Sequence, residues 1–423
     1  MGRLSHSPVN DFASHLGTID LSPDGGSHRT KEKSLIAWTL VQTVESIETH
    51  IAKDREELAK AKVPVIVAGN GVRISGAFDA LAEIAELLGA PVVTSILGKS
   101  ALPETHHMAA GPMGYTGLPF ANEIVGMADT ILVVGCRLKP QDTCFEHPDM
   151  FDPNRQTIIQ IDVDPRNASW TIPTDVALAG DANETLQLLL AGLDGRVDSE
   201  VRNTRRDAFL EMKAARAFFA DPMRTSEASP IAPQRLVGEI NDTVPAEAIV
   251  CTDAGSNRHW MNHHFRTRRP GSYFGSGGLG GVSWSLPAAL CAKILEPDRP
   301  AVGVCSDGGF AMQMHVLLSA VQYEANPVYV VMNNSRLGMT AEGMGNQSHG
   351  NDFPDTDYAA IARACGAWAE RVENPAEIGD AIQVAMGQDR PAVIDVVIDK
   401  SESMRAAIYS PLATEAARGV RPR

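Results

Sequence analysis

Short apolar segments alternate repeatedly with segments of helical periodicity, and this alternation limits the possible folds more than any other feature of the chain. VPVIVAG at 63–69 and TILVVG at 130–135 are almost wholly apolar, as strands buried on both faces of a parallel sheet are. TIIQIDVDP at 157–165 continues the series, and apolar-periodic helices are indicated between the strands. We therefore expect a doubly wound α/β domain, the central domain, over residues 63–195.

A second series of the same kind follows a charged helical linker at 196–229. The strands AIVCTDAG, AVGVCSDGG, PVYVVMNN and PAVIDVVID are separated by helical segments, which predicts another parallel-sheet domain over 230–400. Residues 1–33 are interpreted as a flexible arm, 34–62 as a helix and 401–423 as a tail without a clear period. The expected fold is α/β, with two doubly wound parallel-sheet domains joined by a helical linker.

Charge and cysteine content narrow the classes of partner. The 423 residues include 37 lysines and arginines against 52 aspartates and glutamates, which gives a net charge of −15 and argues against nucleic acid as a partner. The chain has neither an apolar run long enough for a membrane span nor the basic stretch and apolar core of a secretory signal. Its 6 cysteines are scattered without a CxxC pair, so we expect reduced thiols in a cytoplasmic protein.

Polar residues follow two consecutive strands of the second domain. Asp307, Gly308 and Gly309 come directly after one strand, and Asn334 comes after the next. Because a right-handed crossover brings both strand ends to one edge of the sheet, these residues are expected to lie together. A carboxylate and an amide oxygen suit Mg²⁺ that keeps diphosphate oxygens as ligands, while the glycines allow backbone N–H groups to approach phosphate. The alternative is two unrelated turns, with Asp307 as a helix cap; the combination and its spacing favour the ligand site.

The segment SDGGFAMQMHVLLSAVQYEANPVYVVMNNSRLGM resembles the signature of thiamine-diphosphate (ThDP) enzymes of the acetolactate synthase and 2-oxoacid decarboxylase group. That signature is a Gly-Asp-Gly turn followed by paired asparagines, and Ser306 here replaces its first glycine. The resemblance implies that Mg²⁺ is bound by the side chains of Asp307 and Asn334 and by the backbone carbonyl of Arg336. It also places the next three residues in the wall of the cofactor and substrate pocket: Leu337, Gly338 and Met339.

Two further segments are similar to parts of these enzymes that contact ThDP. CTDAGSNRHWMNHHF looks like the segment that wraps the diphosphate, which implies contacts from Ala254, Gly255, Ser256 and Asn257. SGGLGGVSWSLPAAL looks like the segment that bends the cofactor. Gly280 would offer its carbonyl to the 4′-amino group of the aminopyrimidine, and Val282 would be the hydrophobic wedge where acetolactate synthases carry Met. The alternative for this second segment is a flexible glycine-rich hinge.

The first α/β domain is similar to the central domain of the same family, which in relatives carries FAD, a nucleotide such as ADP or CoA, or no ligand. GNGVRISG lacks the third glycine of a dinucleotide fingerprint, and an acidic residue at the right distance is not evident. We interpret it as a tight turn between a strand and a helix. FAD, ADP and CoA are therefore not predicted for this domain.

Enzymes of this group also carry a pyrimidine-binding domain, whose glutamate protonates the aminopyrimidine ring. Residues 1–62 do not resemble that domain, and the glutamates at 45, 48, 56 and 57 are interpreted as solvated charges. The resemblance thus implies a split enzyme in which a separate pyrimidine-domain subunit supplies the glutamate, in a hetero-oligomer of α2β2 or larger. Within this chain no catalytic residue is certain.

The function implied by the resemblance is decarboxylation of a small 2-oxo acid, with release of an aldehyde or its ligation to a second carbonyl. Two alternatives stay open. One is a subunit of a 2-hydroxyacyl-CoA lyase, which shares these motifs, and the other is a non-catalytic ThDP-binding regulatory or scaffold protein.

The histidines are candidates for metal ligands or for residues of the site. His259 and His263 share a helix face at a spacing of four, but the glutamate that accompanies such a pair in zinc enzymes is missing, so a zinc site is not expected. His106, His107 and His315 are interpreted as surface or packing residues, although His315 follows the Asp307 turn closely enough to line a cleft there.

Overall fold

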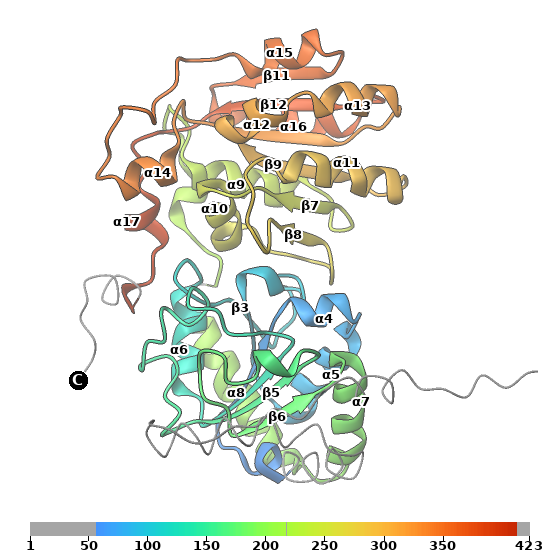
Figure 1. Cartoon of the computed structure of the whole chain (residues 1–423), viewed down its shortest axis with the longest axis vertical. Coiled ribbons are helices and arrows are strands. Elements are labelled where there is room, and N and C mark those ends of the chain that lie inside the picture. The colour runs from blue at the N-terminus through green and yellow to red at the C-terminus, as the bar shows by residue number, and fades with distance from the viewer. Residues whose placement is uncertain (1–55, 217, 413–423) are drawn as a thin grey trace, which may run out of the picture.

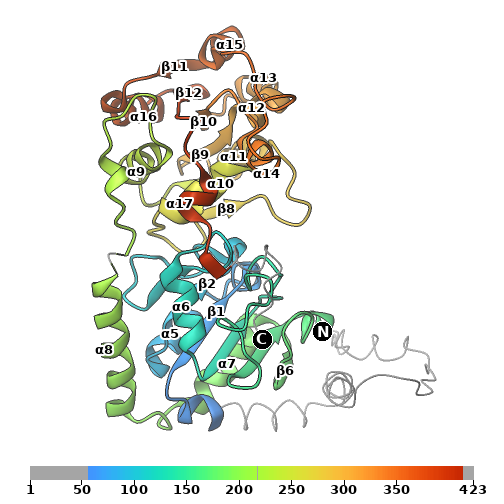
Figure 2. The same cartoon turned by 90° about the vertical axis from the view of Figure 1, so that its left-hand side faces the viewer.

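Two α/β domains, one above the other in Figures 1 and 2, make up the molecule. The structure, a computed structural model, describes residues 56–216 and 218–412. The predicted arm at 1–33, most of the predicted helix at 34–62 and the end of the predicted tail lie outside the described residues. In the described part, no helix is both long and apolar enough to cross a membrane. All six cysteines are free thiols.

The central domain is built on a six-stranded, wholly parallel sheet with the strand order β3-β2-β1-β4-β5-β6. Its strands are β1 (Pro64–Ala68), β2 (Val92–Thr94), β3 (Ala109–Pro112), β4 (Thr130–Val134), β5 (Thr157–Asp162) and β6 (Val176–Ala179). Its helices are α4 (Asn70–Ile74), α5 (Phe78–Leu88), α6 (Pro119–Met127), α7 (Ala182–Leu193) and α8 (Ser199–Ala215), with short 3₁₀ turns η1 (Ile96–Gly98) and η2 (Pro165–Asn167).

The C-terminal domain repeats this plan with the strand order β11-β12-β10-β9-β7-β8, again wholly parallel. Its strands are β7 (Ile249–Thr252), β8 (Tyr273–Gly275), β9 (Ala301–Ser306), β10 (Val328–Asn333), β11 (Trp368–Val372) and β12 (Ala392–Val397). One face is covered by α9 (Pro233–Thr243), α10 (Ser256–His264), α16 (Ile378–Met386) and α17 (Met404–Ile408). The other is covered by α11 (Ser285–Leu295), α12 (Asp307–Gln313), α13 (Val316–Gln322) and α15 (Tyr358–Ala364). The remaining short elements are α14 (Gly338–Gly343), η3 (Pro222–Thr225) and η4 (Pro375–Glu377).

The predicted fold class is confirmed, and the physical reason is visible in the strands. All five residues of β1, and all five of β4, are buried, because helices cover both faces of the sheet. The short strands β3, β6, β8 and β11 were not predicted. They are the four edge strands of the two sheets, three to five residues long, and such strands need no long apolar run.

Two helical segments differ from the sequence-based expectation. The segment after β1, expected to be a loop, begins with the one-turn helix α4. The single helix expected after the Asp307 turn is divided into α12 and α13, with Met314 and His315 between them. The division lets α13 bury Val316, Leu317 and Ala320 against the sheet, while the direction of α12 is set by the turn that precedes it.

The predicted linker contains α8, which packs against the central domain and does not simply span the gap to the next one (Figure 2). Phe209 of α8 is buried in the central core. Arg205 donates hydrogen bonds to the carbonyls of Leu88 and Ala59, both at 3.0 Å. These contacts place the far end of α8 where the chain can enter the C-terminal domain.

A buried ion pair joins the two domains. Lys99 Nζ lies 2.6 Å from Glu104 Oε1, and both side chains are almost fully buried. The other carboxylate oxygen of Glu104 accepts hydrogen bonds from the backbone N–H and the hydroxyl of Thr267, which belongs to the C-terminal domain. Lys99 also lies over the ring of Tyr273, with its Nζ 5.5 Å from the ring centroid. Burial lowers the pKa of Lys99 and the Glu104 carboxylate opposes that shift, so the charge depends on its partner.

Removing one partner of this pair should destabilise the whole chain. Lys99→Met leaves Glu104 buried without a counter-ion, which we expect to lower the free energy of unfolding by about 3–5 kcal/mol. The double variant Lys99→Met with Glu104→Gln should lose less, because no unpaired charge remains. Urea unfolding measures both. Lys60→Met, which removes the partner of Glu56 in an exposed pair, is the control and should behave as wild type. A Lys99→Met variant as stable as this control would contradict the assignment.

Candidate functional site

A cavity of about 300 Å³ lies at the carboxyl edge of the C-terminal sheet. The loops after β7, β8, β9, β10 and β12 form it, at the edge where open parallel sheets bind ligands. Most of the predicted site residues line this cavity: Ala254, Gly255, Ser256, Asn257, Gly280, Val282, Asn334, Arg336, Leu337, Gly338 and Met339. Asp307, Gly308 and Gly309 are buried next to the lining residue Ser306. The structure therefore brings the predicted residues together, while their roles as ligands stay predictions.

The segment predicted to wrap the diphosphate is the start of α10. Gly255 precedes the helix with φ of +115°, a conformation that favours glycine. Asn257 is buried, and its side-chain oxygen accepts a hydrogen bond from the backbone N–H of Arg258 at 2.6 Å. The N–H of Arg258 is thus occupied, while those of Ser256 and Asn257 at the start of α10 have no intrahelical partner and lie at the cavity, as suits an anion.

The turn after β9 is capped by Ser306 and not by Asp307. The Ser306 hydroxyl accepts a hydrogen bond from the backbone N–H of Gly309 at 3.1 Å. The alternative in which Asp307 is only a helix cap is therefore wrong. Asp307 Oδ1 accepts from the N–H of Gly308 at 2.8 Å, and Oδ2 accepts from the N–H of Arg336 at 3.1 Å, in the loop after β10.

The carboxyl group of Asp307 has the character expected of a cation ligand. It is fully buried, and burial raises its pKa to about 6 although backbone N–H groups oppose the shift. Among the described residues, no lysine or arginine side chain forms an ion pair with it. The donor set around it, with the side chain of Asn334 and the carbonyl of Arg336, consists of oxygens that Mg²⁺ accepts. The residues therefore fit the metal and the diphosphate that the sequence predicts.

The loop after β10 is held in place by the segment that follows it. Arg336 Nε pairs with Asp352 Oδ1 at 2.5 Å, and the N–H of Leu337 donates to the carbonyl of Asn351 at 2.8 Å. The carbonyl of Arg336 accepts the N–H of Gly338 at 2.9 Å and keeps a second lone pair for a ligand.

The glycine-rich loop at 276–283 reaches over the cavity. Gly278 and Gly280 have φ of +63° and +64°, a conformation open to glycine, and no described atom lies within 4 Å of a Cβ built on either. Leu279 is fully exposed at its tip, and Val282 is 43% exposed. A hydrogen bond within the loop holds its two ends together: the Ser276 hydroxyl donates to the carbonyl of Gly281 at 3.0 Å.

Several residues of the site were missed from the sequence. Arg258, Glu342 and Lys400 also line the cavity, and Asp253 lies buried directly before the lining residue Ala254. Asp253 and Lys400 follow strands at the same sheet edge, which is the signal that could have found them. Glu342 gave no signal, because its role is tertiary: its carboxylate accepts the N–H of Met404 at 2.7 Å and so joins α14 to α17.

The histidine pair of α10 is structural. His259 is buried between two side chains of the central domain, with Nδ1 2.9 Å from the Thr116 hydroxyl and Nε2 3.2 Å from the Tyr115 hydroxyl. Burial lowers the pKa of His259 to about 3, so the ring stays neutral. His315 is exposed and is not among the residues that line the cavity.

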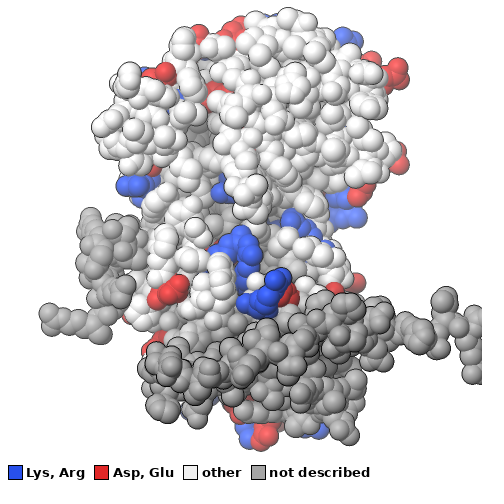
Figure 3. Space-filling view, viewed as in Figure 1, with Lys and Arg blue, Asp and Glu red and all other residues white. Residues whose placement is uncertain are grey.

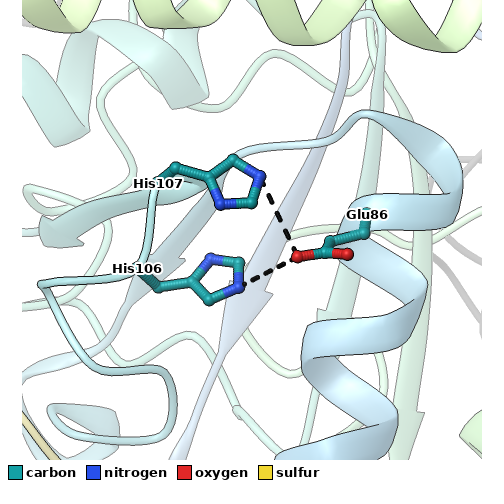
Figure 4. Close-up of side chains that lie close together, drawn as sticks. All are labelled: Glu86, His106 and His107. Atoms are coloured by element: carbon teal, nitrogen blue, oxygen red, sulfur yellow. Dashed lines mark ion pairs between the residues drawn. The ribbon is translucent and has the colours of Figure 1, made fainter.

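A second cluster with metal-ligand atoms lies on the central domain, where His106 and His107 face Glu86 of α5 (Figure 4). Their Nε2 atoms lie 3.3 and 3.9 Å from one carboxylate oxygen. The backbone N–H of Met108 donates to His106 Nδ1 at 3.2 Å, which leaves the proton of the neutral ring on Nε2, where a metal would have to bind. The ammonium group of Lys213, 3.1 Å from the carbonyl of His106, adds a nearby positive charge. This cluster is therefore a hydrogen-bonded group and not a prepared metal site.

The glycines of GNGVRISG are explained by packing at the crossing of two strand ends. A Cβ on Gly69 would lie 2.2 Å from the carbonyl oxygen of Gly135, and one on Gly71 would lie 2.6 Å from the Cα of Gly135. This agrees with the interpretation of the segment as a tight turn. A cavity of about 380 Å³ opens beside it and is lined by Arg137 and Lys139 among others.

The buried Asp307 should lower the stability of the fold while it allows a cation to bind. Because its folded-state pKa is raised, its contribution to stability is present at low pH and is lost as the pH rises through about 6. Asp307→Asn should therefore unfold with a free energy about 2 kcal/mol higher than wild type at pH 8, and with a smaller gain at pH 5, without added ThDP and Mg²⁺.

The same variant should lose Mg²⁺-dependent binding of ThDP, measured by calorimetry, because the amide cannot neutralise the cation. Asp357→Asn removes a carboxylate that caps α15 away from the cavity and should bind normally. Normal ThDP affinity in Asp307→Asn would refute the metal assignment.

Comparison with known proteins identifies both domains. Residues 51–189 match the family model of the thiamine pyrophosphate enzyme central domain, and residues 253–396 match that of the C-terminal TPP binding domain. The chain is 32% identical over 365 residues to a probable acetolactate synthase large subunit of Methanocaldococcus jannaschii, which covers 84% of this chain and 60% of that protein.

Two further relatives are also named as enzymes, a synthase and a transferase. The acetolactate synthase isozyme 3 large subunit of Escherichia coli K12 is 30% identical, over 83% of this chain and 62% of its own length. Sulfoacetaldehyde acetyltransferase of Castellaniella defragrans is 27% identical, over 80% of this chain and 61% of its own length. The chain thus spans about 60% of the length of the curated relatives it matches. With both of its domains matched in order, the chain belongs to the thiamine pyrophosphate enzymes.

Proposed function

We propose that this chain is the ThDP- and Mg²⁺-binding component of an enzyme that decarboxylates a 2-oxo acid and releases an aldehyde or ligates it to a second carbonyl. The observation that carries the proposal is the convergence, at one sheet edge, of three features. They are the buried Asp307 without a counter-ion, the open N-terminus of α10 and the glycine loop at 276–283. The names of the relatives support the same chemistry.

In this proposal the chain binds and orients the cofactor. Asp307, Asn334 and the carbonyl of Arg336 hold Mg²⁺, and the first turn of α10 holds the diphosphate through backbone N–H groups. Gly280 presents its carbonyl to the aminopyrimidine. Bound ThDP supplies a carbon nucleophile that adds to the carbonyl of the 2-oxo acid and allows CO₂ to leave.

We further propose that the site is completed by a pyrimidine-binding domain on a separate subunit, in a hetero-oligomer of α2β2 or larger. The rim of the cavity supports a partner domain, because apolar side chains are exposed there. Leu279 is fully exposed and Val282 is nearly half exposed, beside the pocket in which the cofactor is proposed to bind. A domain that covers these residues would also exclude water from the reacting atoms.

The helices on one face of the C-terminal sheet form a second candidate contact surface. The C-terminal domain shows a broad surface with few charged side chains in Figure 3. Large apolar side chains are exposed along α11, α12 and α13 and just after α13, and they are Ile294, Leu295, Met312, Leu318, Val321 and Tyr323. Exposed apolar side chains gathered on one side of a domain are typical of protein interfaces.

The proposal is tested by purification of the tagged chain after expression with its genomic neighbours. We expect a stoichiometric partner with a pyrimidine-binding domain, tight ThDP binding in the complex, and CO₂ release from pyruvate or larger 2-oxo acids. Conversion of a 2-hydroxyacyl-CoA without CO₂ release would refute the proposed reaction. ThDP binding without any turnover in the complex would make the chain a non-catalytic binder.

The proposed partner surface has its own test. Leu318→Glu combined with Met312→Glu should abolish association, because two charges would be buried in an apolar interface. Val384→Glu is the matched control, since Val384 is 49% exposed on α16, on the opposite face of the same sheet. Association that survives the double substitution, or is lost equally in the control, would place the partner elsewhere.

A further inference from the structure

The glycine loop at 276–283 is attached to the strand end that precedes the diphosphate-binding turn. Two charged side chains make the attachment; both lie in the segment CTDAGSNRHWMNHHF, but the resemblance to ThDP enzymes assigned no contact to either. Asp253 comes directly after β7, and Arg258 lies in the first turns of α10. Between them in the chain are the four residues assigned to the diphosphate, Ala254–Asn257.

Arg258 holds the beginning of the loop. Its Nη1 donates a hydrogen bond to the carbonyl of Ser276 at 2.7 Å, and the guanidinium is half-buried. The Ser276 hydroxyl donates to the carbonyl of Gly281 at 3.0 Å, and the N–H of Gly280 donates to the carbonyl of Gly277 at 3.2 Å. The loop is therefore closed at its neck, and the neck is fixed to α10 by a charge-assisted hydrogen bond.

Asp253 holds the end of the loop. Its carboxylate is fully buried, and Oδ2 accepts the N–H of Ser283 at 2.8 Å. Ser283 has φ of +74°, and its hydroxyl donates to the carbonyl of Gly309 at 2.7 Å. A Cβ on Gly309 would lie 2.4 Å from Asp253 Oδ2, so the carboxylate requires glycine in the turn that carries Asp307.

Between these two attachments the loop has little other support. No described atom lies within 4 Å of a Cβ built on Gly278, Gly280 or Gly281, and Leu279 is fully exposed. The central domain contributes one contact at the neck, where a Cβ on Gly277 would lie 3.2 Å from Leu97 Cδ1. The position of the tip is therefore set at its two ends.

We propose that Asp253 and Arg258 are positioning residues, which fix the loop that faces the aminopyrimidine relative to the turns that face the diphosphate and the metal. Since one short segment, from the end of β7 into α10, carries both the anchors and the proposed diphosphate contacts, the two halves of the cofactor are located by the same part of the chain. This assignment of a role in cofactor binding rests on the proposed function. The anchoring itself does not, and it can be measured in the chain alone.

The test compares Arg258→Met, which keeps the length but removes the donors, with Arg258→Lys, which keeps a cationic donor, and with Asp253→Ser. Hydrogen exchange of the backbone amides in 276–283 is measured in the full chain without ThDP. We expect about tenfold faster exchange in Arg258→Met and Asp253→Ser, the size of effect expected for a lost charge-assisted hydrogen bond. Arg258→Lys should lie close to wild type.

Matched controls separate this role from general stability. Arg299→Met removes a hydrogen bond from an arginine Nε to the carbonyl of Glu247, 2.9 Å away and outside the cavity, and Asp357→Asn removes the cap of α15. Both controls should leave exchange in 276–283 unchanged, and Arg258→Met should keep the thermal midpoint of wild type. If Asp253→Ser does not fold, the two Arg258 variants decide. Unchanged loop exchange in Arg258→Met would overturn the anchoring.

A second measurement addresses the cofactor. The dissociation constant of ThDP, measured by calorimetry with Mg²⁺, should rise about tenfold in Arg258→Met and stay near wild type in Arg258→Lys and in Arg299→Met. If exchange changes but affinity does not, the anchors hold the loop without positioning the cofactor, and the proposal fails. If the wild-type complex binds no ThDP at all, the proposed function fails, while the exchange experiment still decides whether the anchors hold the loop.

Discussion

The buried carboxylate of Asp253 joins three segments that are far apart in the sequence. Asp253 directly follows β7, and its carboxylate accepts the N–H of Ser283 at the end of the glycine loop and lies against Gly309 in the turn that carries Asp307. Loops over a parallel sheet have no ladder of hydrogen bonds of their own, so their positions depend on such side-chain contacts. The shape of the cavity therefore follows from where the strands end and from one charge buried between them.

A second buried carboxylate, Asp307, is unfavourable for the fold and useful for the site. Burial raises its pKa to about 6, which means that the ionised form costs more free energy here than in water, although it still predominates at neutral pH. Its only close partners in the described part of the chain are backbone N–H groups, which orient the carboxylate without neutralising it. Strain of this kind is characteristic of binding sites, because a group that was already satisfied would gain nothing from its ligand.

The central domain contributes to the site from outside it. The buried Lys99–Glu104 pair fixes the segment after η1 against Thr267 and Tyr273, and Leu97 of η1 reaches the neck of the glycine loop. His259 of α10 lies within hydrogen-bond distance of the hydroxyl groups of Tyr115 and Thr116 of the same domain, which fixes α10 from that side as well. These hydrogen bonds and the buried ion pair attach the central domain to the part of the C-terminal domain where the cofactor is proposed to bind.

The sequence by itself determined the fold class, the edge of the sheet that carries the site and most residues of that site. Strands that are apolar throughout, without alternation of polar residues, must be covered by helices on both faces of the sheet. Residues that follow consecutive parallel strands meet at one edge of that sheet. Tertiary structure alone decided that Ser306 and not Asp307 caps α12 and that α12 and α13 are separate. It alone also decided that Arg258 and Glu342 belong to the site and that Asp253 holds Ser283. The physical reason is that these facts depend on burial and on contacts between residues distant in sequence, which local pattern does not encode.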